Sequence, residues 1–248
     1  MRCAGSSALR SRLRLRSRAV SSSTDWWNSP RGTTDVGPSS RQATLVCGRF
    51  ALNVHGESVF DSFDWLDRGR ATDEGAEPWS PMRNIAPTNE SLLIGKRPGA
   101  KPTLRRMRWG MTTSANTKTR TQINARVETL HARPLFRRAF QRGRCLVPAT
   151  GYYEWFDAGE GKKPYYAVDA RGQLLLMAGL YERSAAGVFG FVVVTQPSSG
   201  TASQYHARMP LLVPAAQRER WLDDPDPRTR LRSVETSLHW SQTDPNKT

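Results

Sequence analysis

The chain has 248 residues, of which 38% are hydrophobic and 9% aromatic, and this composition predicts one folded domain with a hydrophobic core. No run approaches the ~18 consecutive apolar residues of a membrane-spanning helix, so we expect no membrane partner. Lys and Arg outnumber Asp and Glu by 37 to 22, a formal charge of +15. This excess fits two interpretations equally: a solvated basic surface, and binding to a polyanion such as nucleic acid.

Residues 1–46 differ in composition from the rest of the chain. They contain eight Arg against two Asp, with many Ser, Gly and Thr, which predicts disorder. The same composition is typical of a mitochondrial transit peptide. In a third interpretation the extension is wrongly assigned and translation begins at Val46, since a GTG codon is read as Met at a start. We therefore divide the chain into an N-terminal extension, 1–46, and one domain, 47–248.

The first half of the domain mixes strand-like and helix-like patterns. Residues 49–54 alternate like a strand, and 58–68 carry apolar residues at helical spacing. Residues 80–90 form a proline-bounded loop that leads to a short strand at 91–95. These segments are too short for a helical bundle and indicate a domain that contains both element types.

The second half of the domain is dominated by strands. Residues 133–143 predict a short helix with Pro134 in its first turn and Gly143 as its stop. Strand-like runs, each bounded by turn formers, follow at 144–156, 163–170, 173–182 and 189–196. Many strands with few helices predict an α+β fold, a single domain whose β core is mainly antiparallel and barrel-like.

The cysteines give no sign of a disulfide framework or a metal centre. Cys3, Cys47 and Cys145 are widely spaced, form no CxxC pair and have no neighbouring His cluster. No Walker or Rossmann fingerprint occurs either, so we expect neither a metal nor a cofactor. Cys145 lies in an apolar strand-like run and is interpreted as buried filler. Cys47 stands where the folded pattern begins and requires another explanation.

Four segments place polar, reactive residues in apolar or turn-like contexts: "CGRF" at 47–50, "INARVET" at 123–129, "GYYEW" at 151–155 and "YHARMP" at 205–210. In this order, with "RNIAPT", "RWG" and "RCLVPATGYYEW", they resemble the SRAP family over roughly residues 46–214. The resemblance implies an SRAP-like domain that forms covalent crosslinks with abasic sites in single-stranded DNA. Because several short motifs occur in the right order, the match is specific.

The resemblance gives Cys47 the central role. It implies that the preceding residues are removed, so that Cys47 becomes residue one and its amine and thiol trap the aldehyde of a ring-opened abasic sugar as a thiazolidine. An α-amine has a pKa of about 7.7–8.0 and a thiol one of about 8.5, so both nucleophiles are available near neutral pH. An internal Cys47 has an amide nitrogen instead, and this route is then closed.

The remaining catalytic assignments follow from matching motif positions, each beside a simpler interpretation. The resemblance makes Asn124 the residue that orients the amine, although an Asn at a strand end also bonds its own backbone. It makes Glu154 an acid/base whose aromatic neighbours should raise its pKa by desolvation; the alternative is an outward-facing strand residue. It assigns sugar-ring opening to His206, which is otherwise a loop histidine.

The candidate DNA-binding residues also have a functional and a structural interpretation. The resemblance implies that Arg126 holds a phosphate and that Asn84 lies near the active site; Trp109 is either a stacking platform for a base or a core residue. The further phosphate-binding candidates, each of which also suits a surface ion pair, are Arg49, Arg83 and Arg208. The basic residues of the predicted helix, Arg137, Arg138 and Arg142, are interpreted as a solvated face.

Three functions compete at this point. The first is a monomeric abasic-site crosslinking enzyme, from a family also described by peptidase, hydrolase and lyase activities, in the cytoplasm or nucleoid of a bacterium or in the mitochondrion or nucleus of a eukaryote. The second is a noncovalent single-strand binding module whose Cys47 is capped by the extension. The third is a thiol autopeptidase that uses Cys47 with His206; it requires a stabilised thiolate, which the strand-like context of Cys47 does not favour.

Overall fold

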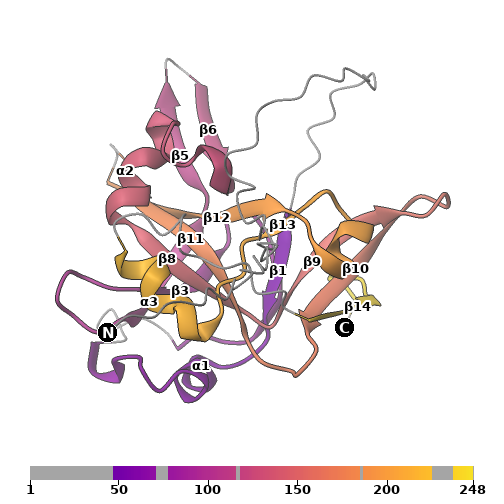
Figure 1. Cartoon of the computed structure of the whole chain (residues 1–248), viewed down its shortest axis with the longest axis horizontal. Coiled ribbons are helices and arrows are strands. Elements are labelled where there is room, and N and C mark those ends of the chain that lie inside the picture. The colour runs from indigo at the N-terminus through magenta and orange to yellow at the C-terminus, as the bar shows by residue number, and fades with distance from the viewer. Residues whose placement is uncertain (1–46, 71–77, 116–117, 185–186, 225–236, 248) are drawn as a thin grey trace, which may run out of the picture. The chain divides into compact units, whose positions relative to one another are not determined.

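The computed structural model describes residues 47–70, 78–115, 118–184, 187–224 and 237–247 (Figure 1). The chain divides into two units, Met1–Ser40 and Arg41–Thr248, and every described residue belongs to the second. The predicted extension at 1–46 lies outside the described residues, so the three interpretations of it stay predictions.

A ring of five strands forms the centre of the domain. The strand order β11–β8–β3–β4–β12 closes because β12 also pairs with β11. All neighbours are antiparallel except β4 and β12, which are parallel. Closure leaves these strands without an exposed edge. Their bounds are β3 Glu90–Gly95, β4 Thr103–Trp109, β8 Arg144–Ala149, β11 Leu175–Arg183 and β12 Phe189–Pro197.

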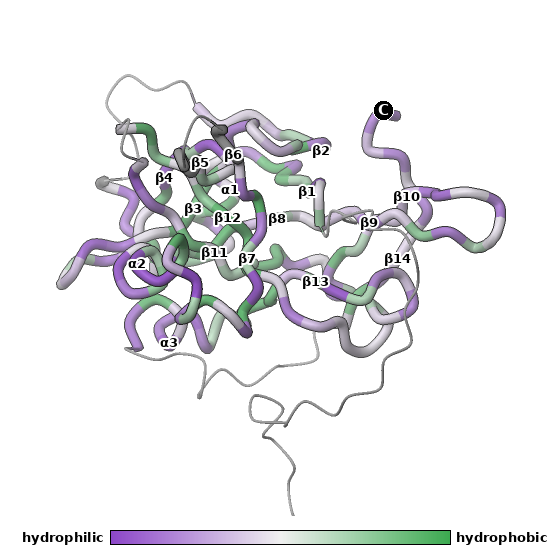
Figure 2. The backbone as a smooth tube through the Cα atoms, turned by 90° about the horizontal axis from the view of Figure 1, so that it is seen from above, coloured by the Kyte–Doolittle hydropathy of each residue, from purple (hydrophilic) through white to green (hydrophobic). Residues whose placement is uncertain are grey.

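Two of the barrel strands, β8 and β12, are buried on both faces. All six residues of β8 and seven consecutive residues of β12 are buried. Such continuous runs are expected where both faces of a strand are covered. Figure 2 shows the apolar segments gathered among β3, β11 and β12. At the parallel seam, a Cβ on Gly190 would lie 2.2 Å from the carbonyl oxygen of Gly110, so the β4 and β12 chains approach as closely as they do only because glycine stands there.

Two short strands flank β12. β7 (Asn124–Arg126) pairs with it in parallel and β13 (Arg208–Pro210) antiparallel, while β5 (Met111–Ala115) and β6 (Lys118–Gln122) form a separate hairpin. Thr195 of β12 therefore has Arg126 on one side and Pro210 on the other. The segments "INAR" and "YHARMP", 80 residues apart in the sequence, meet at this junction.

A second, open sheet carries the remaining motifs. Its order is β14–β10–β9–β1–β2, antiparallel throughout. The register pairs Arg49 with Tyr153, so "CGRF" lies beside "GYYEW". In Figure 1 the β9–β10 hairpin extends away from the barrel strands. The bounds are β1 Arg49–Leu52, β2 Met82–Ile85, β9 Gly151–Asp157, β10 Lys162–Asp169 and β14 Leu238–Gln242.

The helices among the described residues are short. α2 (Pro134–Arg142) begins with Pro134 and ends before Gly143, as the sequence predicts, with its Arg side chains exposed. α1 (Gly56–Ser62) and α3 (Arg218–Asp223) each cover one or two turns. Turns of 3₁₀-helix occur at Arg68–Arg70, Val127–Thr129, Gly200–Gln204 and Ala215–Gln217. None of the helices in the described part of the chain has the length and apolar content to cross a membrane.

The predicted fold class is confirmed, with two local corrections. The domain is α+β with a mainly antiparallel barrel, as expected. The helical pattern at 58–68 is wrong in extent, since α1 ends at Ser62 and the later apolar residues are buried without a helix. The predicted loop at 80–90 contains β2, which forms because β1 offers it backbone partners from 30 to 35 residues away, Leu52 for Met82 and Phe50 for Ile85.

Candidate active site

Cys47, just before β1, contacts Glu154 on the neighbouring strand β9 of the open sheet. The backbone nitrogen of Cys47 donates a hydrogen bond to Oε1 of Glu154 at 2.8 Å, across 107 residues of sequence. Cys47 is fully buried and Glu154 is 2% exposed. The antiparallel register of β1 and β9 creates this contact, because it places the residues just before Arg49 beside those just after Tyr153.

The backbone of Cys47 adopts an uncommon conformation. Its φ is 46°, in the left-handed region that residues with a Cβ rarely visit. Such a conformation costs on the order of 1–2 kcal/mol and persists where the surrounding structure fixes it. Here it occurs at the residue whose nitrogen meets the Glu154 carboxyl group, which marks the position as a candidate functional site.

Burial favours the neutral form of both the Glu154 carboxyl group and the Cys47 thiol. It raises the pKa of Glu154 to about 8, even though the hydrogen bond from the Cys47 nitrogen opposes the shift. The carboxyl group therefore exchanges protons near neutral pH, in the direction that the sequence predicts. Burial and then the nearby Glu154 raise the pKa of the Cys47 thiol well above its usual value. A thiol peptidase requires the opposite shift, toward a stable thiolate.

His206 lies at the junction of β7, β12 and β13. It is half-buried and precedes β13, and its Nδ1 is 3.0 Å from the backbone nitrogen of Arg208 and 3.1 Å from its oxygen. This contact fixes the ring through Nδ1. Asn124, half-buried on β7, is in register with Val193 of the same junction.

Arg208 is held by an ion pair with Glu128. Its guanidinium donates to both carboxylate oxygens of Glu128, at 2.8 and 3.0 Å, and to the carbonyl oxygen of Thr195 at 2.8 Å. Partial burial acts against ionisation of Glu128, but the Arg208 hydrogen bonds and the charges of Arg208 and Arg126 outweigh it and lower its pKa. Of the two interpretations of Arg208, the structure supports the ion pair.

An aromatic cluster connects this junction to the open sheet. The ring of Tyr205, next to His206, stacks on Trp240 of β14 with centroids 4.1 Å apart and planes 15° apart. It also contacts Tyr165 of β10 and Phe156 of β9. Phe156 lies two residues beyond Glu154 on the same strand, so the segment that carries His206 packs against the sheet that carries Cys47 and Glu154.

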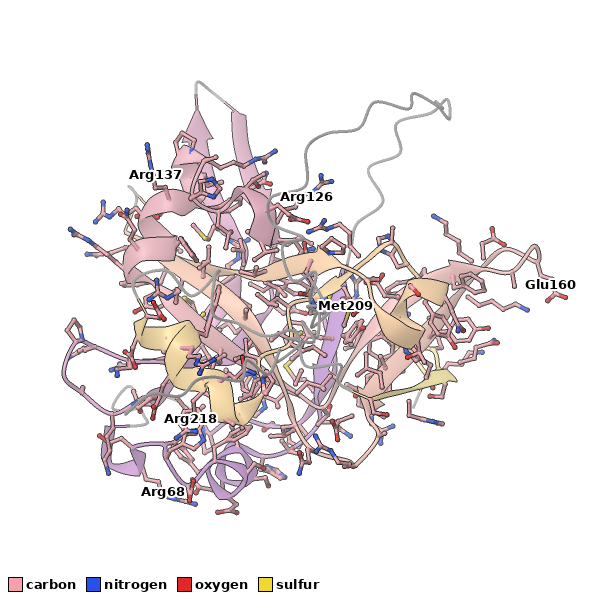
Figure 3. All side chains as sticks on the ribbon, viewed as in Figure 1. Arg68, Arg126, Arg137, Glu160, Met209 and Arg218 are labelled. Carbon is pink, nitrogen blue, oxygen red and sulfur yellow. The ribbon has the colours of Figure 1, made fainter. Side chains whose placement is uncertain are left out.

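The basic candidates for DNA binding differ in exposure. Arg83 and Arg126 are exposed, and Figure 3 shows Arg126 at the surface of the molecule. Arg49 is half-buried, and its guanidinium donates to the carbonyl oxygen of Gly48 at 2.9 Å. Asn84 is half-buried, and its amide nitrogen donates to Oδ1 of Asn246 at 2.8 Å. Arg83 and Arg126 are therefore the candidates most accessible to a phosphate.

Trp109 is a core residue and presents no face to a base. Its side chain is fully buried, its ring lies 5.0 Å from that of Phe50 and 6.4 Å from that of Phe191, and its indole N–H donates to the carbonyl oxygen of Ile123. The stacking interpretation of Trp109 is therefore wrong, because the barrel closes over the ring. Cys145 is fully buried in β8, as the sequence predicts.

Comparison with known proteins assigns the chain to a family. Residues 46–244 match the model of the family described as SOS response associated peptidase (SRAP). The chain belongs to the SRAP family. Since this match covers most of the chain, the resemblance carried by the four short motifs is confirmed.

Relatives of this SRAP protein carry the name abasic site processing protein. YedK of Escherichia coli (strain K12) is 32% identical over 186 residues, which cover 71% of this chain and 79% of YedK. YoaM of Bacillus subtilis (strain 168) is 28% identical over 186 residues, 72% of this chain and 79% of YoaM. HMCES of Xenopus tropicalis is 27% identical over 222 residues, 72% of this chain and 66% of HMCES.

Solved structures share the fold of this SRAP domain. A protein from Bordetella bronchiseptica superimposes with a TM-score of 0.64 and 25% identity, covering 80% of this chain and all of that chain. A protein from Bacteroides thetaiotaomicron gives a TM-score of 0.65 at 18% identity, over 81% and 97% of the two chains.

Two residues that the structure places beside the candidate site residues, Glu128 and Tyr152, are not among those that the sequence motifs indicate. Glu128 pairs with Arg208 across 80 residues, and no local pattern indicates this contact. Tyr152 is two residues before Glu154, so strand alternation puts both on one face, which is a signal the sequence does contain. Within the described residues, no group of three or more His, Cys, Asp and Glu side chains is arranged to hold a metal ion.

Proposed function

We propose that this SRAP protein processes abasic sites in single-stranded DNA by forming a thiazolidine crosslink through Cys47, once the residues before Cys47 are absent. The observation that carries the proposal is the buried hydrogen bond of 2.8 Å between the Cys47 nitrogen and Glu154. The names of its relatives, abasic site processing proteins from bacteria and a vertebrate, support an abasic site in DNA as the substrate.

The proposed chemistry uses the two groups of Cys47 in turn. The unprotonated amine attacks the aldehyde carbon of the ring-opened sugar and forms a carbinolamine as one amine proton passes to the oxygen. Glu154, whose burial favours its protonated form, protonates the departing hydroxyl, which leaves as water, and the resulting carboxylate takes up the proton that the nitrogen loses as the imine forms. The Cys47 sulfur then bonds to the same carbon while the thiol proton goes to the imine nitrogen. The net change is the loss of one water, without an oxidant or reductant.

The neutral thiol fits this sequence of steps. The raised pKa of Cys47 keeps its sulfur protonated and less reactive until the imine has formed, and the thiol then supplies the proton that the imine nitrogen takes up. A thiolate would suit the autopeptidase interpretation instead. The crosslinking order, amine first and sulfur second, is therefore the one that the burial of Cys47 favours.

The other groups complete the proposal. His206 assists opening of the closed sugar, and its segment packs against the sheet of Glu154 through Tyr205. Asn124 orients the amine. Arg83 and Arg126, the exposed cations, contact phosphates beside the lesion.

The decisive experiment compares two forms of the protein. One begins at Cys47, and the other is the 248-residue chain. The described fold is formed by residues 47–247, so the shorter form keeps every described contact. Each is mixed with an oligonucleotide that contains one abasic site, and adducts are resolved on an SDS gel and weighed by mass spectrometry. We expect an adduct only from the form that begins at Cys47. Its mass should be that of the protein plus the oligonucleotide, less one water.

Two controls make this experiment decisive. A tetrahydrofuran abasic analogue has no aldehyde and should give no adduct, and Cys47→Ala should give none while noncovalent binding persists. An adduct that survives Cys47→Ala contradicts the proposed nucleophile. Salt-sensitive binding with no adduct from either form would instead establish the noncovalent module.

A further inference from the structure

Tyr152 is buried, as are Cys47 and Glu154. On β9 it is two residues before Glu154, so both side chains project from the same face of the strand. Its register partner on β1 is Phe50, three residues after Cys47. The charges of Cys47 and Glu154 both act on its phenol group and, after burial, contribute to raising its pKa. The phenol is therefore near both reactive groups.

The hydroxyl of Tyr152 is buried and has no partner among the residues that the structure describes. The residue is fully inaccessible, and among the described residues its Oη has no hydrogen-bond partner. Buried hydroxyl groups are normally paired, because leaving one unpaired costs free energy. By contrast, the hydroxyl of the adjacent Tyr153 donates to the carbonyl oxygen of Arg83 at 3.1 Å on the other face of the strand. A phenol whose only role was packing would need no hydroxyl at this position.

The ring of Tyr152 is fixed by its neighbours. It packs edge-on against Trp240, with centroids 5.5 Å apart and planes at 84°. Trp240 in turn stacks on Tyr205, the residue next to His206. The hydroxyl is thus held in place by the same aromatic cluster that joins the two halves of the candidate active site, and a fixed donor is what oxyanion stabilisation requires.

We propose that Tyr152 is a further catalytic residue, whose hydroxyl donates a hydrogen bond to the oxygen of the abasic-site aldehyde and of the carbinolamine formed from it. This role rests on the proposed function of Cys47. When the amine attacks, the carbonyl π electrons move onto the oxygen, and the Tyr152 O–H stabilises that developing charge. Glu154 then supplies the proton with which the oxygen leaves as water, and Tyr152 keeps its own proton throughout.

The test is Tyr152→Phe in the protein that begins at Cys47, which removes only the hydroxyl. We expect the single-turnover rate of adduct formation at saturating DNA to fall about 10-fold or more. The dissociation constant for the tetrahydrofuran analogue should be unchanged, because that analogue has no carbonyl oxygen. The thermal midpoint should stay equal or rise, since an unpaired buried hydroxyl has been removed. Loss of rate together with unchanged or increased stability cannot come from a packing defect.

Tyr153→Phe is the matched control, and it should leave the rate unchanged. An unchanged rate in Tyr152→Phe, beside a normal rate in the parent protein, would overturn the role of Tyr152 and leave the proposed function standing. Equal slowing in both variants would also overturn it, by showing a general effect on the strand. Absence of an adduct from the parent protein contradicts the proposed function and this inference together.

Discussion

The open sheet around Glu154 and the β7–β12–β13 junction around Glu128 each hold a carboxyl group, the first 2% exposed and the second with 34% of its side chain exposed, and they shift its pKa in opposite directions. Burial of Glu154 raises its pKa to about 8, and its hydrogen-bond donor is a backbone nitrogen. Glu128 receives two hydrogen bonds from Arg208, and its pKa is lowered. Two differences account for the opposite shifts: Glu154 is more deeply buried, and Glu128 is paired with a guanidinium.

The largest expected effect is on the pH dependence of stability. Because the pKa of Glu154 is raised on folding, its contribution is fully present below about pH 4.5 and is lost as pH rises to about 8, a loss on the order of 4 kcal/mol. Urea unfolding of the 248-residue chain and of Glu154→Gln between pH 5 and 8.5 measures it. The Gln variant should lack this decline, and parallel pH profiles would contradict the burial of an ionisable Glu154.

The same carboxyl group should dominate the rate of crosslinking. In the form that begins at Cys47, Glu154→Gln should slow adduct formation about 10²-fold, equivalent to about 2.7 kcal/mol, because the departing hydroxyl loses its proton donor. His206→Ala should slow it similarly with a ring-closed substrate. Glu160→Gln is the control, since Glu160 is exposed at the tip of the β9–β10 hairpin (Figure 3). Normal rates in the first two variants would remove both residues from the mechanism.

Breaking the ion pair between Glu128 and Arg208 should lower the stability of the fold. Arg208→Met should lower the free energy of unfolding by about 2 kcal/mol, because Glu128 and the Thr195 carbonyl lose a charged donor. The lowered pKa of Glu128 means that this stabilisation is present above about pH 4.5 and is lost as pH falls below it. Arg138→Met, which breaks an exposed ion pair with Glu182, should cost below about 0.5 kcal/mol. If Arg208→Met and Arg138→Met lowered the free energy of unfolding equally, the Glu128–Arg208 pair would have no special structural role.

The smallest expected effect concerns DNA affinity. Arg126→Ala should weaken noncovalent binding of the tetrahydrofuran analogue by about 1 kcal/mol and reduce the salt dependence by about one phosphate contact. Arg137→Ala is the control, because its side chain is also exposed but belongs to α2 (Figure 3). Titrations at several salt concentrations distinguish the two, and identical losses would mean that binding follows net charge alone.

Local signals account for what the sequence predicts of the fold. Pro134 and Gly143 delimit α2 because each acts on the backbone around it, and continuous apolar runs identify β8 and β12. β2 is not predictable in this way, since "MRNI" becomes a strand only beside β1. Trp109 shows the same limit, because an aromatic residue at a strand end suits a surface or a core until the ring of strands closes.

The site depends even more on long-range pairing. Motif order indicates Cys47, Asn124, Glu154 and His206 as a set, but no alternation along β9 reveals that both of its faces are buried at Tyr152, Tyr153 and Glu154. The β1–β9 register then brings Glu154 to the Cys47 nitrogen. The Glu128–Arg208 pair has no local signal at all, so the same charge on Arg208 suits a phosphate contact or an ion pair until β12 brings the two residues together.

Cys47 and Glu154 are separated by 107 residues, so Cys47 is synthesised on the ribosome well before Glu154. At about 5–20 residues per second, Cys47 leaves the exit tunnel roughly 5–20 s before Glu154 does. Throughout that interval β9, the partner of β1, has not yet been made, so the peptide bond before Cys47 is accessible to a processing enzyme. If Cys47 is to become residue one, as we propose, we therefore expect the preceding residues to be removed most easily from the nascent chain, before Glu154 meets the Cys47 nitrogen.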